Sequence, residues 1–307
     1  FTSILRPNSS KIENKYLFYF LFYQHKIRKV LKYQNKTTGI INLKLENYLT
    51  NTNIKLPNRK EQQRIVRLLD QSFELIEKRK NQIREMDRLT QSLFMEMFGD
   101  PFLNTKNYPK KKLGNLGKVI TGNTPSKKNP DYYGDYIEWI KSDNINPSSC
   151  FLTTAQEYLS KLGSEKGRLV PENSILVTCI AGSKSSIGKA AIANRKVAFN
   201  QQINAIIPNE NVNVYFLYTH FQVGKKLVQL ASTNGMKGLV SKSAFEKIEF
   251  ICPPFKEQEN YGEMFLLILE KKNILLESLK YLEENYNSIM QRAFKGLLFN
   301  KDKVSNL

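Results

Sequence analysis

The amino-acid sequence predicts an α+β protein that combines a mixed, curved sheet with two long helices, which pair as an antiparallel coiled coil. Three observations lead to this fold class. Part of the chain is repeated, and each copy ends in a long polar stretch with apolar residues at seven-residue intervals. The segment between the two stretches consists of short apolar runs separated by Gly, Pro, Asn and Ser.

The repeat is visible as a constant spacing between matching residues. Lys60-Glu61-Gln62 recurs as Lys256-Glu257-Gln258, 196 residues later, and Pro57 recurs as Pro253. An aromatic segment and a turn match at the same spacing: Tyr19-Phe20-Leu21 with Tyr215-Phe216-Leu217, and Thr37 and Gly39 with Thr233 and Gly235. A spacing that is constant over such different landmarks argues against chance similarity between two helices.

The order of the segments divides the chain into five parts. We expect the closing part of a first globular domain, a first long helix, a complete second globular domain, a second long helix and a tail, at residues 1–56, 57–100, 101–253, 254–299 and 300–307, respectively. Residues 101–214 have no counterpart upstream, and the chain opens with Phe1. The first domain is therefore expected to be truncated at its N-terminal side.

The two long helices carry the coiled-coil signal. Residues 58–98 contain neither Pro nor Gly, and Asn58 followed by Glu61 predicts a capping box at the helix start. The positions expected to pair are Leu69, Ile76, Ile83, Met86 and Leu93 in the first helix and Ile268, Leu275, Leu282 and Ile289 in the second. A stripe of this length needs another long helix, and two repeated copies pair most simply antiparallel. The alternative is a dimerisation coiled coil between two chains.

The complete globular domain is expected to contain a mixed sheet. Its strands are predicted at residues 117–120, 136–140, 174–180, 190–193 and 204–207. An amphipathic helix is predicted at residues 217–230.

Three apparent enzyme motifs fail on their spacing or context. Gly182 to Lys189 resembles a phosphate loop, but five residues instead of four separate its glycines, and Ala190 replaces the magnesium-binding Ser or Thr. Asn129-Pro130-Asp131-Tyr132 has the form of a methyltransferase motif but lacks a preceding Gly-rich cofactor loop. Glu138 and Lys141 suggest a nuclease, but a spacing of three places them on opposite faces of a strand. We therefore expect no catalytic residues in this chain and no cofactor.

Cysteine, histidine and hydropathy patterns exclude further classes. Cys150, Cys179 and Cys252 form no CxxC pair, and His25 and His220 lie apart, so we predict no metal site and a reducing cytoplasm. The longest aromatic run, residues 16–23, is far shorter than the roughly 20 residues of a membrane-spanning helix. We expect no membrane association.

The net charge of +19 points to a polyanionic partner. Residues 1–56 hold 10 basic and 2 acidic side chains, and residues 101–253 hold 20 and 10. The two helical segments are nearly neutral, with 9 basic and 8 acidic side chains in residues 57–100 and 6 and 7 in residues 254–299. The excess charge is thus expected on the globular parts, and the helices would face protein.

Five predicted loops of the second domain carry side chains that read nucleic acid. Lys and Arg contact phosphates and guanine, whereas Asn and Gln can bond adenine through two hydrogen bonds. Each such loop by itself is more often merely solvated, but their recurrence on a basic domain favours DNA binding. The candidate contacts are Thr124, Ser126, Lys127, Lys128, Lys141, Ser142, Asn144, Ser183, Lys184, Ser185, Lys189, Asn200, Gln201, Gln202, Lys237 and Lys242.

The order of these motifs resembles the specificity subunit of type I restriction-modification systems. The residues that carry the resemblance are Gly122 to Ser126, Trp139 to Asn144, Gly182 to Gly188, Phe199 to Gln202, Thr233 to Lys237, and Pro253 to Gln258 followed by a long helix. The resemblance implies target-recognition domains that each read half of a bipartite site in double-stranded DNA, and helices that act as a ruler. It also implies a non-catalytic subunit that docks methyltransferase (modification) subunits and restriction (motor and nuclease) subunits.

One departure leaves alternatives open. Residues 1–56 match only the closing part of the first recognition domain, so one complete domain would act alone or through a dimer. The chain could instead be a detached specificity portion of a fused methyltransferase-nuclease polypeptide, which catalytic motifs upstream of Phe1 would reveal. A coiled-coil assembly protein with incidental charge is the third reading, and it predicts no affinity for duplex DNA.

Overall fold

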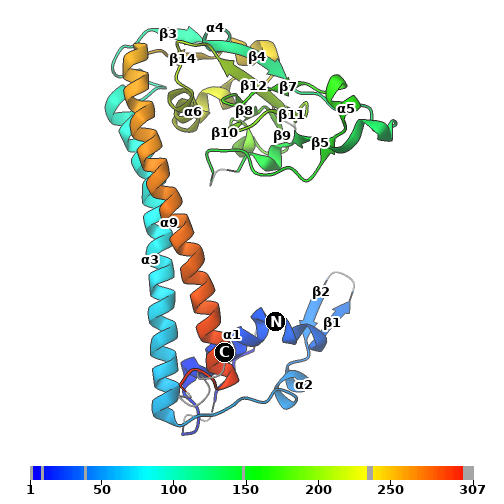
Figure 1. The fold of residues 1–307 in the computed structure, drawn as a ribbon, viewed down its shortest axis with the longest axis vertical. Coiled ribbons are helices and arrows are strands. Elements are labelled where there is room, and N and C mark those ends of the chain that lie inside the picture. Colours follow the sequence, from blue (N-terminus) through cyan, green and yellow to red (C-terminus); the bar gives the residue numbers. More distant parts are fainter. Residues whose placement is uncertain (1–2, 8–9, 38–39, 147–148, 234–237, 300–307) are drawn as a thin grey trace. The chain divides into compact units, whose positions relative to one another are not determined.

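Figure 1 shows the protein as a computed structural model. It describes residues 3–7, 10–37, 40–146, 149–233 and 238–299. The chain forms two compact units, one of residues 1–85 with 272–307 and one of residues 86–271. Two long helices, α3 (Arg59–Phe98) and α9 (Phe255–Lys295), each contribute to both units. Each unit is therefore described by itself.

The long helices begin and end close to where the sequence predicts. They contain 40 and 41 residues. At the start of α3, the Asn58 side chain accepts a hydrogen bond from the backbone N–H of Glu61 at 3.0 Å, which confirms this half of the predicted capping box.

The first unit surrounds the start of α3 and the end of α9. Its other elements are α1 (Asn14–Lys26), the 3₁₀ helix η1 (Lys29–Tyr33), α2 (Leu45–Thr50), and the strands β1 (Gln34–Thr37) and β2 (Ile40–Leu43). The two strands form an antiparallel hairpin. The buried core joins α1 to both long helices through Tyr16, Tyr19, Phe20, Ile65, Leu69, Ile76, Tyr286, Met290 and Phe294.

Four of the predicted coiled-coil positions lie in or against the core of the first unit, and pairing of the others stays a prediction. Leu69 and Ile76 are buried in the first unit, and Leu282 and Ile289 pack against the same core. The Lys80 ammonium lies 3.3 Å from the Glu283 carboxylate. The other predicted positions are half-buried: Ile83, Met86, Leu93, Ile268 and Leu275.

The helices are antiparallel within each unit. In the first unit the start of α3 shares its core with the end of α9. In the second unit the end of α3 meets the start of α9, where the Phe94 and Phe98 rings each lie 5.6 Å from the ring of Tyr261. The Tyr261 hydroxyl also donates to the Thr90 carbonyl at 3.2 Å. The predicted antiparallel pairing is confirmed.

The second unit is built on two four-stranded sheets. The antiparallel sheet has the order β10-β8-β12-β4 and consists of β4 (Gly117–Thr121), β8 (Ile175–Thr178), β10 (Ala190–Ile192) and β12 (Ile203–Pro208). The mixed sheet has the order β6-β5-β11-β7 and consists of β5 (Tyr133–Ile140), β6 (Tyr158–Leu159), β7 (Leu169–Val170) and β11 (Val197–Phe199). It is mixed because β5 and β11 are parallel and the other pairs are antiparallel.

Shorter elements complete this unit. Two small antiparallel ladders pair β3 (Lys110–Lys112) with β14 (Glu249–Ile251) and β9 (Ile180–Ala181) with β13 (Gly238–Leu239). The helices are α4 (Leu113–Leu116), η2 (Pro130–Tyr132), η3 (Ser142–Asn144), α5 (Lys161–Lys166), η4 (Lys184–Ser186), α6 (Val214–Val223), α7 (Lys225–Leu230) and α8 (Lys242–Glu246).

All five predicted strand regions are strands, with two differences from the expected elements. Residues 174–180 form the two strands β8 and β9 instead of one. The prediction of a single helix at residues 217–230 is wrong, because this region forms two helices, α6 and α7, that are separated at Gly224. A Cβ at Gly224 would lie 2.7 Å from the His220 carbonyl oxygen, so only glycine fits this break.

The two copies of the sequence repeat also form matching hydrogen bonds. The buried amides of Gln62 and Gln258, each 1% exposed, donate at 2.8 Å to the carbonyls of Pro57 and Pro253, respectively. The Gln62 Oε1 atom accepts from the backbone N–H of Glu13, the N-cap of α1, and the Gln258 Oε1 atom accepts from that of Asn213, the N-cap of α6.

This geometry corrects the register of the sequence repeat in its first helix. Gln62 and Gln258 are 196 residues apart, but the matching caps, Glu13 and Asn213, are 200 residues apart. Four extra residues amount to about one helical turn, so the apolar face is nearly unchanged and the ungapped alignment does not reveal the shift. Among the described residues, none of the helices is both long and apolar enough to cross a membrane.

Candidate nucleic-acid interface

Four of the five predicted loops start or end at one edge of the two sheets of the second unit. Strand β11 turns into β12 through residues 200–202, and this turn joins the sheets. The strand registers place three other loop boundaries beside it: Ile140 opposite Phe199, Thr178 opposite Ile203, and Thr121 opposite Asn204. Segments that lie far apart in the sequence therefore meet at the 200–202 turn.

Backbone hydrogen bonds fix this junction. The N–H groups of Cys179 and Ile180 donate to the Gln202 carbonyl at 2.8 and 3.0 Å. The Gly122 N–H donates to the Ile203 carbonyl at 3.1 Å. A Cβ on Gly122 would lie only 2.1 Å from the Asn200 carbonyl oxygen, so the close approach of the first loop requires glycine.

The four predicted amide side chains differ in their surroundings. Asn144, 7% exposed, accepts from the Lys141 N–H and donates to the Thr154 carbonyl. Asn200, 6% exposed, exchanges two hydrogen bonds of 3.1 Å with Gln202. Gln201 is exposed, and its Oε1 accepts a hydrogen bond from the Thr124 hydroxyl. Asn144 and Asn200 thus organise the loops, and their contact with DNA stays a prediction.

The second loop packs on the same turn. The Ser142 hydroxyl donates to Gln202 Oε1 at 3.3 Å. The Lys141 ammonium lies 5.0 Å from the Trp139 ring and forms an ion pair with Glu157. The predicted first-loop residues Thr124, Ser126, Lys127 and Lys128 are all exposed.

The third loop is hydrogen-bonded to α7. Ser183, Lys184 and Ser185 are exposed, while the Lys225 ammonium donates to the Ser185 carbonyl at 2.6 Å. Burial and the nearby charge of Lys189 lower the pKa of Lys225. A polyanion bound here would relieve this repulsion. The loop leads into strand β10 instead of a helix, so it lacks the helix N-terminus of a phosphate loop.

The fifth loop reaches the junction through β13, which pairs with β9. The Val240 N–H donates to the Cys179 carbonyl at 2.9 Å. Lys242 is exposed at the start of α8, where the Ser241 hydroxyl accepts from the Ala244 N–H. Lys237 lies outside the described residues.

A shallow cleft of about 520 Å³ beside the first loop contains basic residues that are not among the contacts predicted from the sequence. Lys118 and Arg168 line it together with Lys242, and Glu165 is the one acidic side chain on its described walls. The loop of Arg168 is tied to the junction, since its N–H donates to Asn123 Oδ1 at 2.7 Å. Strand alternation could have revealed Lys118, which is exposed between the buried Gly117 and Val119.

Glu138, one residue of the apparent nuclease motif, has a structural role. The Glu138 carboxylate accepts from the guanidinium of Arg195 and from the Ala155 N–H, and these bonds hold its pKa below the usual range although burial opposes them. Glu138 is thus occupied in joining strand β5 to two loops. Among the described residues, His, Cys, Asp and Glu form no cluster of three or more that could hold a metal ion.

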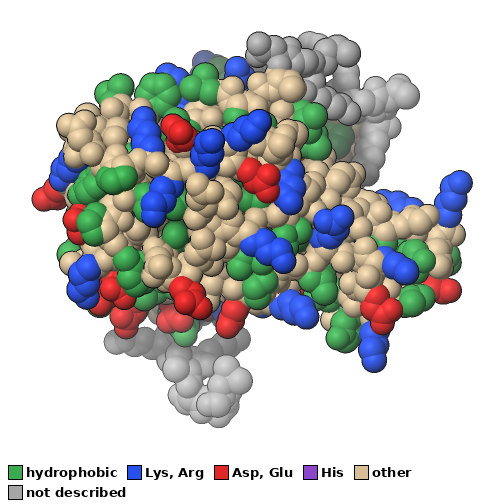
Figure 2. Space-filling view, turned by 90° about the horizontal axis from the view of Figure 1, so that it is seen from above, with side chains coloured by type: hydrophobic (Ala, Val, Ile, Leu, Met, Phe, Trp, Pro, Cys, Tyr) green, Lys and Arg blue, Asp and Glu red, His purple; other side chains and the backbone are tan. Residues whose placement is uncertain are grey.

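Figure 2 shows one face of the molecule, on which Lys and Arg side chains are spread between hydrophobic and a few acidic ones. Because the basic side chains do not form a single isolated patch there, charge alone does not outline an interface on this face. The junction of polar loops is the more specific feature.

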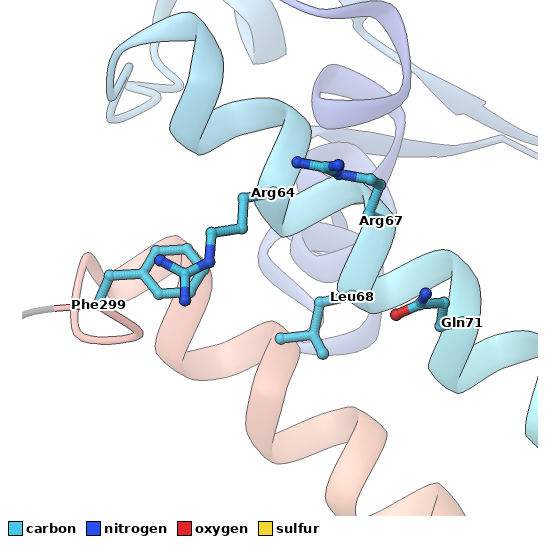
Figure 3. Close-up of a pocket in the computed structure, with 5 residues that line it drawn as sticks. All are labelled: Arg64, Arg67, Leu68, Gln71 and Phe299. Carbon is cyan, nitrogen blue, oxygen red and sulfur yellow. The ribbon is translucent and has the colours of Figure 1, made fainter.

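A second cleft, of about 410 Å³, lies in the first unit between one face of α3 and Phe299, which follows α9 (Figure 3). Arg64, Arg67, Leu68 and Gln71 line it with Phe299. The Arg64 guanidinium lies 4.1 Å from the centre of the Phe299 ring, so this cation is already engaged by an aromatic face.

Comparison with solved structures identifies the class of fold. A chain from a structure on complex assembly and conformational transition of the type I R-M system aligns with a TM-score of 0.62, at 17% identity, over 96% of this chain and 74% of that chain. The type I restriction-modification system S subunit from M. genitalium gives a TM-score of 0.58, at 15% identity, over 92% and 73%. The fold is therefore that of restriction-modification specificity subunits.

Sequence comparison gives the family. The model of the type I restriction modification DNA specificity domain matches residues 3–85 and 105–284, and the chain belongs to this family. The specificity subunit of the type I restriction enzyme HindI from Haemophilus influenzae is 34% identical over 62% of this chain. A putative type I restriction enzyme MjaX specificity subunit from Methanocaldococcus jannaschii is 22% identical over 95% of this chain and 70% of its own length. The chain spans 42% of the Haemophilus protein.

Proposed function

We propose that this chain is a non-catalytic DNA-specificity subunit of a type I restriction-modification complex. Residues 101–253 would read one half of a bipartite target. The observation that carries the proposal is the junction of separate polar loops around residues 200–202, on a segment with 20 basic and 10 acidic side chains. Specificity subunits among the relatives support it.

The charged residues around the junction would supply affinity. Lysine and arginine contacts to phosphates hold a protein on the duplex and fix its register. Lys127, Lys128, Lys184 and Lys242 are exposed on the predicted DNA-binding loops that also carry the polar side chains proposed to meet base edges. Lys118 and Arg168 would extend the phosphate contacts along the neighbouring cleft.

The long helices would be the spacer and the docking surface for methyltransferase and restriction subunits. They are almost neutral, unlike the globular segments. In the first unit, Phe73 and Leu75 of α3 and Ile274 and Tyr281 of α9 are large apolar side chains that remain exposed. Exposed apolar side chains on a neutral helix pair suit a protein partner better than a nucleic acid.

Selection from a randomised duplex library tests the proposal. The chain, in complex with a cognate modification subunit, is expected to enrich one half-site motif, and scrambled versions of this motif should bind much more weakly at physiological salt. Equal binding to selected and scrambled duplexes would refute sequence-specific recognition. The modification subunit alone is the control.

A further inference from the structure

One amide side chain at the loop junction differs from the others in being free to meet a base. Asn144 and Asn200 are buried, and Gln202 is half-buried with its Oε1 atom accepting from both Ser142 and Asn200. Gln201 lies between two of these residues in the chain but is exposed. Its Nε2 group donates no hydrogen bond to any described residue.

Building on the proposed function, we propose that Gln201 is the specificity-determining residue for an adenine in the half-site. An amide matches the major-groove edge of adenine, because Nε2 can donate to N7 while Oε1 accepts from the N6 amino group. The Thr124 hydroxyl occupies one of the two lone pairs of Gln201 Oε1. The second lone pair and the amide hydrogens remain for the base.

The surrounding contacts hold Gln201 in place before DNA binds. Its neighbours Asn200 and Gln202 are locked to each other by two hydrogen bonds, and the Gln202 carbonyl accepts from two backbone N–H groups. The Thr124 hydroxyl then fixes the orientation of the Gln201 amide itself. Less conformational entropy is lost on binding when the contacting group is already ordered, so this arrangement favours discrimination between bases.

The two other amides of the same turn are less suited to contacting a base. To reach a base, Asn200 would have to leave the buried position in which both of its amide atoms are bonded. Gln202 would have to release Ser142, which connects the turn to the second loop. Gln201 requires no such rearrangement, and substitutions at this position should leave the fold intact.

The test repeats the randomised duplex selection with the full chain and its modification subunit. The variants are Gln201→Ala and Gln201→Glu, and the matched control is Asn209→Ala, an exposed amide just beyond the opposite end of strand β12. We expect Gln201→Ala to weaken the preference for one A·T pair between about 5-fold and 150-fold and to leave the other positions unchanged. Gln201→Glu should move that preference toward cytosine, whose N4 amino group donates to a carboxylate. Asn209→Ala should select the wild-type motif.

The possible outcomes separate this inference from the proposed function. If the wild-type complex enriches no motif, the proposed function fails and the role of Gln201 fails with it. If the wild type enriches a motif that Gln201→Ala retains with equal strength, only the role of Gln201 is overturned. Relaxation at a G·C pair would likewise overturn the assignment to adenine.

Discussion

His220 is a neutral histidine that the fold buries completely. Its ring stacks on Phe250 with 3.8 Å between the ring centres, and Nε2 accepts from the Ile251 N–H at 3.1 Å. Burial lowers the pKa of His220 from 6.5 to about 3. Nε2 must therefore be unprotonated in the folded protein, and the histidine serves as a hydrogen-bond acceptor between α6 and β14.

This pKa predicts a loss of stability in mild acid. Between pH 6.5 and 3 the unfolded chain binds a proton at His220 that the folded chain does not, so the free energy of unfolding falls as the pH falls. Each pH unit within this range costs about 1.4 kcal/mol. Chemical denaturation at pH 6.5 and 4.5 should show a loss of about 2 kcal/mol that His220→Gln largely abolishes, because an amide oxygen still accepts but does not titrate.

The second histidine provides the control for this experiment. His25 is exposed at the end of α1, so His25→Gln shows what the replacement of a histidine outside the core does to the same measurement. An unchanged pH dependence in His220→Gln would show that other groups cause the acid sensitivity.

At the scale of elements, one buried glutamine connects each long helix to an earlier helix of its unit, Gln62 joining α3 to α1 and Gln258 joining α9 to α6. Gln62 contacts the carbonyls of Pro57 and Lys11 and the N–H of Glu13, and Gln258 makes the corresponding bonds to Pro253 and Asn213. The last residue of the repeated Lys-Glu-Gln sequence thus has the same role in both copies, which is to bond backbone groups that are partly or fully removed from water.

Replacing Gln62 should destabilise the first unit. Gln62→Ala leaves partly buried backbone groups of Lys11, Glu13 and Pro57 without this partner, which costs about 1–3 kcal/mol in the free energy of unfolding. Gln63→Ala is the matched control, because the neighbouring glutamine is exposed on the same helix. Denaturant titration measures both, and equal stabilities of the two variants would contradict the structural role of Gln62.

The exposed apolar positions of α9 make a prediction about assembly. Ile274 and Tyr281 are 60% and 68% exposed, and their seven-residue spacing places them on one side of the helix. If this side docks a modification subunit, the double variant Ile274→Glu/Tyr281→Glu should lose at least tenfold in affinity for that subunit, since burying a charge without a partner is costly. Co-purification and calorimetry measure the loss.

Two controls make the assembly experiment specific. Circular dichroism should be unchanged, because both side chains lie outside the core. Lys280→Glu, an exposed charge change on the same helix, should leave the affinity within a few-fold of the wild type. Full affinity of the double variant would place docking elsewhere.

At the scale of the whole molecule, sequence patterns predict what is periodic or local. The extents of α3 and α9 and the main strands follow from hydrophobic spacing and from the positions of Pro and Gly. Partners distant in the sequence were not predictable: Arg195 contacts Glu138 across 57 residues, and this contact explains a carboxylate that otherwise suggests a nuclease. Likewise, residue type alone predicts that Asn144, Asn200 and Gln201 are equivalent DNA contacts. In the structure Asn144 and Asn200 are buried, whereas Gln201 is exposed.

The distribution of charge over the whole chain predicts how the affinity for DNA depends on salt concentration. Each lysine that contacts a phosphate displaces condensed counterions, so the slope of log K against log salt should become shallower by about 0.9 for each contact removed. Lys128, Lys184 and Lys242 are exposed around the loop junction, and replacing all three by Gln should reduce the slope by about 2.7. The matched control replaces Lys78, Lys271 and Lys280, exposed lysines of the near-neutral long helices, and should leave the slope unchanged although the net charge falls equally. Fluorescence anisotropy on a selected duplex between about 50 and 200 mM salt separates the two triple variants. Equal slopes for both would mean that the net charge of the chain, and not a local surface, attracts the DNA.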